Sequence, residues 1–293
     1  MDNRWSEEEA TNLSELSLLA YQSRLIGADP SLVICGGGNT SLKTIQPDFR
    51  GRNTKVLFVK GSGRDMKYAQ TTDFSTLRLD DILPLFERSD VSDEEVAAYL
   101  ERCLMEPGSP RPSIETLLHS FMPHTSIIHS HADSILSLTN NRNSQEILTQ
   151  VFGNDVALVP YRLPGFLLSR EVATTVLKRP GVRGAILLNH GLVTWGSTVK
   201  GNYDTHIELV NQAEEHILKR SIGKVVFGGL SMPQLERDKR HAVAAGVTPA
   251  LRAMLRPKEK DRILLRFDDS ENVLDFIGSA LASSLVEHGA ATP

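Results

Sequence analysis

Residues 111–131 read RPSIETLLHSFMPHTSIIHSH and contain the pattern that decides the fold, a helix followed closely by a buried strand. Apolar residues from Ile114 to Phe121 recur at the spacing of one helical face, and Pro112 and Ser113 are typical of a helix start. After Pro123, the run TSIIHSH is β-rich with a period of two. The segment therefore predicts a helix that packs on a core, a short connection, and a strand that ends in two histidines.

These two histidines, His129 and His131, leave the same face of the predicted strand. Residues i and i+2 of a strand lie about 6.5 Å apart along the backbone, so their imidazoles can converge on one ion. A catalytic Zn²⁺ normally takes three protein ligands and keeps a further position open. The best candidate for the third ligand is His190, at the end of a predicted apolar strand in GAILLNHGLVTWG. Glu115, in the first turn of the predicted helix, is the candidate fourth member, as a ligand or a proton-transfer group.

Each of these residues also has a purely structural interpretation. A single histidine is often an ordinary hydrogen-bonded side chain, and a carboxylate near a helix start complements the helix dipole by about 0.3–1 kcal/mol. The combination of three histidines and Glu115 favours the metal site. The remaining histidines are interpreted as structural or surface residues: His119, His124, His206, His216, His241 and His288.

Two glycine-containing loops follow predicted strands. The first, GGGNTS at residues 36–41, follows a short strand expected at residues 32–35. Its glycines allow close approach of the backbone and can aim amide N–H groups at a phosphate, with a tight hairpin turn as the alternative. The second loop, KGSGR, adds a hydroxyl and two cations that suit a phosphate, although Lys60 and Arg64 could equally be solvated charges. Neither loop matches a dinucleotide fingerprint or a P-loop.

The composition excludes several classes of protein. The 293 residues carry 32 basic and 36 acidic side chains, a formal charge of −4, which gives no overall attraction to nucleic acid or to an anionic membrane. The two cysteines, Cys35 and Cys103, are expected to be reduced thiols and not a disulfide or a zinc site. No apolar run approaches the roughly 20 residues that span a bilayer, and the acidic start is not a signal peptide. We therefore expect a cytoplasmic protein.

The order of elements predicts one main domain with an addition. Residues 1–230 mix strands and helices without a clean βαβ alternation, which favours an α/β domain whose sheet has antiparallel pairs covered by helices. Residues 231–293 are expected to form an appendage of helices and a strand at residues 262–267, which packs on the first domain and has no core of its own. No chemistry is apparent in this appendage.

Six blocks of sequence occur in a fixed order over roughly residues 10–225. They are GGGNTSL (36–42), VKGSGRD (59–65), RPSIETLLH (111–119), HSHA (129–132), VPYRLPGF (159–166) and NHGLVTWG (189–196). Together they resemble the class II aldolase/adducin head family, and most closely the aldolase half of bifunctional rhamnulose-1-phosphate aldolase/short-chain dehydrogenase proteins. The tail resembles the connecting segment of those chains, so the sequence is either a fragment of such a protein or a stand-alone protein without the reductase.

The resemblance implies a role for each matching residue. His129, His131 and His190 match zinc-binding histidines, and Glu115 matches the catalytic acid/base. Tyr161 lies near the position of a tyrosine that works across a subunit boundary. The positions that hold the substrate phosphate are matched by Gly38, Asn39, Ser62, Gly63 and Ser113.

One residue departs from the pattern of the family. Ile114 stands where many aldolases of the family have a second serine. A phosphate site at this position would lose one hydroxyl donor, which leaves the identity of the phosphorylated substrate open.

The resemblance also implies a fold and an activity. The fold is a three-layer αβα sandwich with a mixed, largely antiparallel sheet, assembled as a homotetramer with active sites at subunit interfaces. The activity is cleavage of a ketose 1-phosphate, of the rhamnulose 1-phosphate type, to dihydroxyacetone phosphate and an aldehyde. One Zn²⁺ per subunit would act as a Lewis acid toward the enediolate, while Glu115 moves a proton.

Other activities occur on the same scaffold. A sugar-phosphate epimerase, dehydratase or decarboxylase would share the surroundings of the metal, and an adducin-like interaction module would keep the fold without catalysis. Because the three histidines and the glutamate are all present, the sequence favours an enzyme that acts on a phosphorylated sugar.

Overall fold

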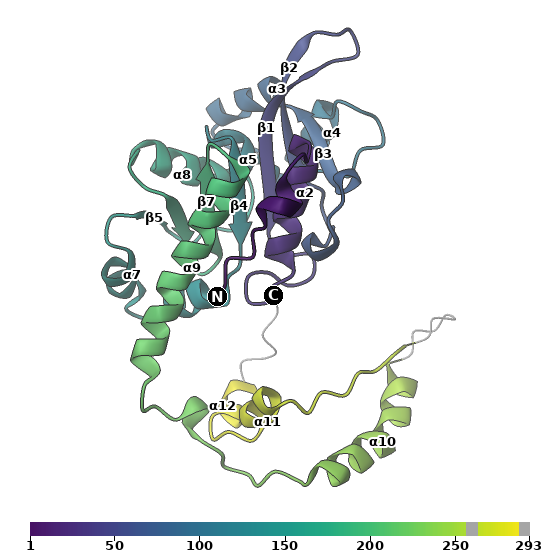
Figure 1. Ribbon diagram of the computed structural model, residues 1–293, viewed down its shortest axis with the longest axis vertical. Helices are drawn as coiled ribbons and strands as arrows, with labels where there is room; N and C mark the ends of the chain where they lie inside the picture. The colour runs from purple at the N-terminus through teal and green to yellow at the C-terminus, as the bar shows by residue number, and fades with distance from the viewer. Residues whose placement is uncertain (256–262, 287–293) are drawn as a thin grey trace. The chain divides into compact units, whose positions relative to one another are not determined.

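The computed structural model describes residues 1–255 and 263–286. The chain divides into two compact units, residues 1–220 and 221–293 (Figure 1). The first unit thus ends ten residues before the boundary expected from the sequence at residue 230. The packing of the C-terminal part on the first unit stays a prediction.

A seven-stranded mixed sheet forms the centre of the first unit, with the strand order β3-β2-β1-β4-β7-β6-β5. In the described part of the chain, all neighbouring strands of this sheet pair antiparallel except β5 and β6, which pair parallel. The predicted mixed, largely antiparallel sheet is confirmed. The strands are β1 (Asn39–Pro47), β2 (Asn53–Lys60), β3 (Phe74–Arg78), β4 (Ser126–Ser130), β5 (Val156–Val159), β6 (Gly184–Leu187) and β7 (Gly191–Gly196).

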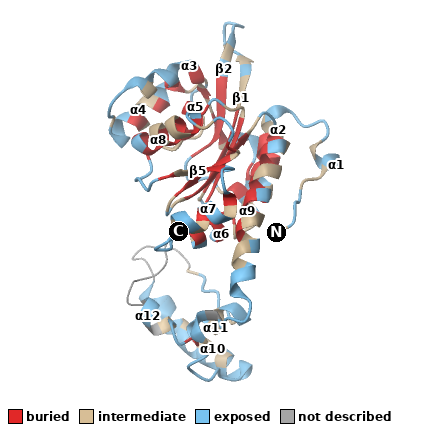
Figure 2. Ribbon diagram, turned by 90° about the vertical axis from the view of Figure 1, so that its left-hand side faces the viewer, coloured by how far each residue is buried: buried red, intermediate tan, exposed pale blue. Residues whose placement is uncertain are grey.

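Helices cover both faces of this sheet, as Figure 2 shows for α2 on one side and α4 and α8 on the other. One face is covered by α2 (Glu15–Gly27), α6 (Asp133–Thr139), α7 (Ser144–Phe152) and α9 (Val199–Ser221). The other face is covered by α3 (Leu79–Ile82), α4 (Asp93–Cys103), α5 (Thr116–Phe121) and α8 (Phe166–Leu177). The predicted three-layer αβα sandwich is confirmed.

Strand β4 shows how the period of two produces these layers. Ile127 packs in the cluster that includes Leu118 of α5, whereas Ile128 packs in the cluster that includes Ile207 of α9. Successive side chains of a strand point to opposite faces. His129 therefore lies on the same face as Ile127, toward α5.

The helix that precedes β4 begins later than its sequence pattern predicts. Helix α5 starts at Thr116, with Glu115 as its N-cap residue. The preceding residues instead run beside the second glycine loop, where the Ser62 N–H donates to the Arg111 carbonyl at 2.8 Å and the Ser75 hydroxyl donates to the Pro110 carbonyl at 2.7 Å. These contacts to other segments hold the backbone out of the helix.

Two expected strands are wrong. Residues 31–38 form turns, in which the Val33 N–H donates to the Asp29 carbonyl and the Gly37 N–H donates to the Ile34 carbonyl. Leu32 and Val33 are buried without pairing in the sheet, whereas Ile34 and Cys35 are exposed. Within the expected strand at 262–267, the described residues 263–267 have no strand assignment, and residue 262 lies outside the described part.

The second unit is built from short elements. It contains a 3-10 helix (Val226–Gly228), α10 (Arg237–Met254), α11 (Glu271–Ile277) and α12 (Ala282–Val286). Arg240 of α10 forms an ion pair with Asp269 at 3.0 Å, and Phe227 stacks edge-on against Phe276. None of the residues of α10 is buried.

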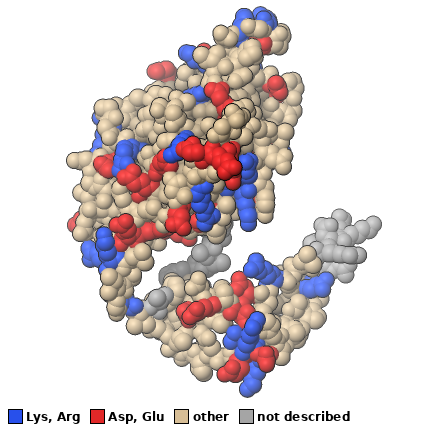
Figure 3. Space-filling view, viewed as in Figure 1, with Lys and Arg blue, Asp and Glu red and all other residues tan. Residues whose placement is uncertain are grey.

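The first unit also contains shorter helices, which complete its connections. They are α1 (Glu7–Ala10) and the 3-10 helices Met66–Tyr68, Thr71–Asp73 and Leu83–Glu87. On the face drawn in Figure 3, acidic and basic side chains lie among one another. Among the described residues, no helix combines the length and the apolar composition needed to cross a bilayer.

Candidate active site

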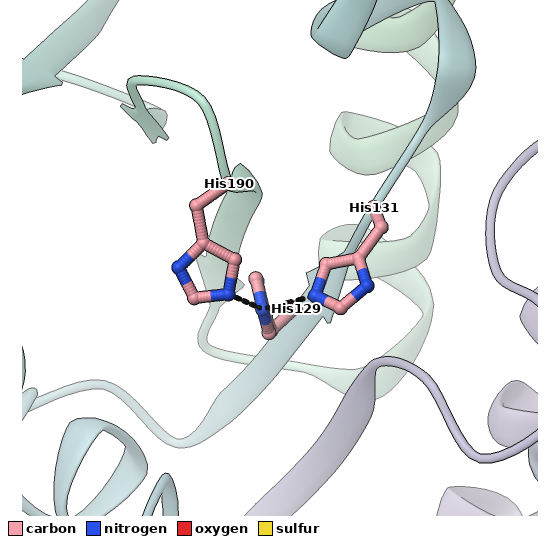
Figure 4. Close-up of side chains that lie close together, drawn as sticks. All are labelled: His129, His131 and His190. Atoms are coloured by element: carbon pink, nitrogen blue, oxygen red, sulfur yellow. Dashed lines mark hydrogen bonds between the residues drawn. The ribbon is translucent and has the colours of Figure 1, made fainter. Parts of the chain in front are cut away.

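The three histidines predicted as metal ligands meet in the structure, and their rings point toward one another (Figure 4). His129 lies in β4, His131 directly follows that strand, and His190 lies in the turn between β6 and β7. The Nε2 atom of His129 is 3.1 Å from that of His131 and 3.3 Å from that of His190. The three ligand atoms all lie within 4.8 Å of one another, which is close enough to share one ion.

The turn that carries His190 has a special backbone conformation. Leu187 pairs with Gly191, so residues 188–190 form a three-residue connection between β6 and β7. Asn189 has a φ of 58°, in the left-handed region that asparagine tolerates better than most residues. The His190 N–H donates to the Leu187 carbonyl at 3.0 Å, which closes the turn and directs the imidazole toward His129.

Gly191 allows the two histidine-bearing segments to approach. A Cβ atom at this position would lie 2.2 Å from the Ser130 carbonyl oxygen and 3.2 Å from ring atoms of both His129 and His131. No other residue fits this space without movement of a strand. The glycine in NHG is therefore required by packing against β4.

The ring of His129 has one tautomer that suits a metal ligand. Its Nδ1 lies 3.1 Å from the Leu192 carbonyl oxygen, which can only accept a hydrogen bond. Nδ1 therefore carries the proton, and Nε2 presents its lone pair to the centre of the cluster. Burial holds the pKa of His129 well below its ordinary value, and burial likewise lowers the pKa of His131. Three imidazole nitrogens that converge in this way fit a divalent metal ion.

Glu115 lies beside this cluster. Its Oε1 is 3.4 Å from Nε2 of His190 and 3.7 Å from Nε2 of His129, and its Oε2 accepts a hydrogen bond from Asn39 at 2.6 Å. Burial raises the pKa of Glu115, but His129, His190 and Asn39 together outweigh it and hold the pKa below its ordinary value. The carboxylate is therefore ionised near neutral pH and can serve as a base or as a ligand.

A pocket of about 130 Å³ adjoins Glu115 and His131. It contains the five residues expected to hold a phosphate, which come from segments far apart in the sequence. The residues that line it are Gly36, Gly37, Gly38, Asn39, Lys60, Gly61, Ser62, Gly63, Ser113, Glu115 and His131. Both glycine loops and the segment before α5 thus face one cavity.

Lys60 connects the two glycine loops. Its side chain is buried, and Nζ donates to the Gly36 carbonyl at 3.4 Å and to the Arg64 carbonyl at 2.8 Å. Burial lowers the pKa of Lys60, and Glu115 opposes that shift. Lys60 is therefore not a solvated loop charge, whereas the Arg64 side chain is 54% exposed and lies 3.5 Å from Asp73.

Two residues singled out in the sequence lie away from the pocket. Tyr161 follows β5, is 55% exposed and does not line the pocket. Ile114 is half-buried against the core cluster of β2, β3, α4 and α5, and does not line it either. At the position of the second serine of the family, this chain therefore has a side chain turned toward the core.

His119, interpreted in the sequence as a structural or surface residue, is linked by hydrogen bonds to Asn39 beside Glu115. It is fully buried, Nδ1 lies 2.7 Å from the Ser41 hydroxyl, and Nε2 forms a short hydrogen bond with Asn39, the residue that binds Glu115. The spacing of four residues from Glu115 was the available signal, since it places both side chains on one side of a helix.

Comparison with known proteins places most of the first unit in one family. Residues 17–217 match the family described as Class II Aldolase and Adducin N-terminal domain. A Bacillus subtilis (strain 168) protein named as an uncharacterized oxidoreductase, YuxG, is 41% identical over 290 residues. That match covers 99% of this chain but 42% of the relative, so the chain spans less than half the length of this relative.

Solved structures show the same fold. The N-terminal class II aldolase domain of a conserved Thermoplasma acidophilum protein is 41% identical and superposes with a TM-score of 0.69, covering 74% of this chain and 99% of that one. A sugar-phosphate aldolase from Thermotoga maritima is 18% identical with a TM-score of 0.50, covering 70% of this chain and 97% of that one. The second likeness concerns the fold alone.

Proposed function

This chain belongs to the class II aldolase and adducin N-terminal domain family, and from that premise we propose that it is a zinc-dependent aldolase. The proposed reaction cleaves a ketose 1-phosphate, of the rhamnulose 1-phosphate type, to dihydroxyacetone phosphate and an aldehyde. One observation carries the proposal: three imidazole Nε2 atoms and a carboxylate converge beside a pocket lined by two glycine loops.

The metal centre of this proposal uses His129, His131 and His190 as ligands for one Zn²⁺ per chain. When bound, the ion supplies a Lewis acid that stabilises negative charge on substrate oxygens. The protein contributes the geometry, because the backbone carbonyl of Leu192 fixes the ring of His129 and the turn at Asn189 directs His190. Such fixed orientation prepares the ligands before the ion arrives.

Glu115 moves the proton. Its Oε1 lies toward the metal ligands, so a substrate atom held beside the metal comes within reach of it. Its other oxygen is held by Asn39, which leaves Oε1 for the transfer. A positioned acid or base of this kind contributes about 10²–10⁴-fold to the rate.

The pocket next to Glu115 holds the phosphate. Ser62 and Ser113 supply hydroxyl groups, the loop at residues 36–38 supplies backbone amides, and Lys60 supplies a positive charge in the wall. Charge-assisted bonds to phosphate are roughly twice as strong as neutral ones. Lys60 therefore offsets the hydroxyl that Ile114 does not provide. An anchored phosphate orients the reacting carbon against the metal, an effect worth several kcal/mol.

The proposal extends to assembly and location. An exposed Tyr161 on the loop before α8 suits a residue that acts in the site of a neighbouring subunit, which supports a homotetramer with interfacial active sites. Sedimentation velocity tests the tetramer directly, and a monomer at micromolar concentration would exclude it. The free thiols of Cys35 and Cys103 suit the reducing cytoplasm.

Metal analysis combined with a substrate screen tests the function. The purified protein is assayed for bound zinc and incubated with a panel of ketose 1-phosphates, with aldehyde release as the readout. We expect about one zinc per chain and aldehyde from at least one substrate. A zinc-bearing protein inert toward the whole panel would refute the aldolase and favour an epimerase, dehydratase or decarboxylase. A protein that binds no metal would favour an interaction module.

A further inference from the structure

A chain of hydrogen bonds runs from the interior of the first unit to Glu115. The Ser41 hydroxyl lies 2.7 Å from Nδ1 of His119, Nε2 of His119 forms a short hydrogen bond with Oδ1 of Asn39, and Nδ2 of Asn39 lies 2.6 Å from Oε2 of Glu115. Asn39 and Ser41 are two residues apart in β1 and share one face, while Glu115 and His119 are one helical turn apart. Strand β1 and helix α5 with its N-cap thus contribute alternate members of this chain of hydrogen bonds.

The direction of every bond in this chain follows from the orientation of the Asn39 amide. Its Nδ2 group donates to Oε2 of Glu115, which leaves its carbonyl oxygen facing His119. That oxygen needs a donor, so Nε2 of His119 carries the proton. Nδ1 is then the acceptor, and the Ser41 hydroxyl donates to it. The arrangement permits a single tautomer of His119.

Burial makes this arrangement depend on His119. The side chains of His119 and Ser41 are fully buried, and Asn39 is 4% exposed. A buried acceptor left without its donor costs about 1–3 kcal/mol, so Oδ1 of Asn39 depends on the ring of His119. Burial, partly opposed by Glu115, lowers the pKa of His119 to about 3, so the ring stays neutral at physiological pH.

We propose that His119 is a positioning residue that fixes the amide of Asn39 and, through it, the carboxylate of Glu115. The inference rests on the proposed function for the role given to Glu115. Without the Nε2–H donor, the Asn39 amide is held by Glu115 alone and loses the bond that anchors it to the interior. An amide that can move no longer fixes Oε2, so Glu115 loses its fixed position beside His129 and His190.

Matched substitutions test the proposal in the full chain. His119→Met removes both ring nitrogens, whereas His119→Gln keeps an N–H donor that reaches Asn39. His206→Met is the control, because His206 is equally buried and binds two hydroxyl groups, of Ser130 and Thr194. We expect His119→Met to lower kcat about 10–100-fold, as for other residues that orient a ligand, with zinc content unchanged. His119→Gln restores most of kcat.

The control separates positioning from general destabilisation. We expect His206→Met to lower the thermal midpoint as much as His119→Met does, while kcat changes less than 3-fold. A folded His119→Met protein with the kcat of the wild type would overturn the proposal. Equal losses of kcat in His119→Met and His206→Met would overturn it as well, since both would then reflect the loss of a buried histidine.

A second measurement needs no substrate. Nitrogen-15 NMR of the histidine rings reports which nitrogen is protonated, and we expect the Nε2–H tautomer for His119 at neutral pH. We also expect the side-chain amide signals of Asn39 to shift in His119→Met and to return in His119→Gln. An Nδ1–H tautomer, or Asn39 signals unchanged in both variants, would overturn the proposal. If these NMR results hold but no aldehyde is released, the aldolase function fails and the positioning chain stands.

Discussion

Replacing Gly191 by alanine tests whether the close approach of β4 and β7 builds the metal site. The new Cβ would lie 2.2 Å from the Ser130 carbonyl oxygen, whereas carbon and oxygen in a favourable contact are about 3.3–3.6 Å apart. One of the two strands must therefore move by about 1 Å. Gly191 is not among the glycines with a positive φ, so the effect of alanine is a steric one.

The size of the effect follows from this displacement. Metal–ligand distances hold to within about 0.2 Å, so a shift of about 1 Å in His129 or His131 breaks the ligand geometry. We expect zinc affinity to fall by at least the 10–100-fold seen when a residue that orients a ligand is changed. Overpacking of this kind costs about 1–3 kcal/mol in the free energy of unfolding.

The assay is a zinc titration against a competing chromophoric chelator, together with urea unfolding of the metal-free protein. Gly181→Ala is the control, because a Cβ there meets no atom within 4 Å and the backbone needs no positive φ. We expect Gly181→Ala to match the wild type in both measurements. A Gly191→Ala protein with unchanged zinc affinity would show that the three histidines do not form the site in this packing.

Three further predictions follow from the same geometry. Glu115→Gln should lower kcat by about 10²–10⁴-fold while bound zinc, measured by elemental analysis, is unchanged; an active variant would exclude its role in proton transfer. Lys60→Met should weaken binding of inorganic phosphate about 10–100-fold in calorimetry, consistent with a charged bond worth about 1.5–3 kcal/mol, whereas the control Arg64→Gln changes it less than 2-fold. His119 and His206 have pKa values of about 3 in the folded chain against an ordinary 6.5, so the unfolded chain binds protons first as the pH falls. The free energy of unfolding should therefore fall as the pH drops below about 6.5, by up to about 1.4 kcal/mol per pH unit for each ring. Urea midpoints that stay the same between pH 7 and pH 5 would contradict this prediction.

The sequence predicts the cluster of three histidines because its members follow from local patterns. His129 and His131 share a face through the period of two, and His190 ends an apolar run that must be a buried strand. The turn at Asn189, which brings His190 to the others, depends on the pairing of β6 with β7 and of β7 with β4. No local sequence pattern encodes that pairing. The convergence of the three histidines was therefore expected only from the number of protein ligands that a catalytic zinc ion takes.

The errors arise where distant contacts decide the local structure. The apolar run at residues 32–35 predicts a strand, but only Leu32 and Val33 are buried, and they lie in turns where the Leu32 carbonyl accepts from the His131 N–H. Helix α5 starts late because the Arg111 carbonyl binds Ser62 in another loop. The link from His119 to Glu115 cannot be predicted from the sequence, because the partners of His119, Asn39 and Ser41, come from a strand far earlier in the chain.

Strand β1 lies between β2 and β4, and in this register Asn39 is the Cα partner of His129. It therefore joins the half of the sheet that ends in the Lys60 loop to the half that carries the histidines. A partial opening that releases β1 dismantles both halves of the site together. A bound phosphate or metal ion should thus slow amide hydrogen exchange across the whole sheet and not only at the residues it touches, because it binds solely to the state in which all strands are docked.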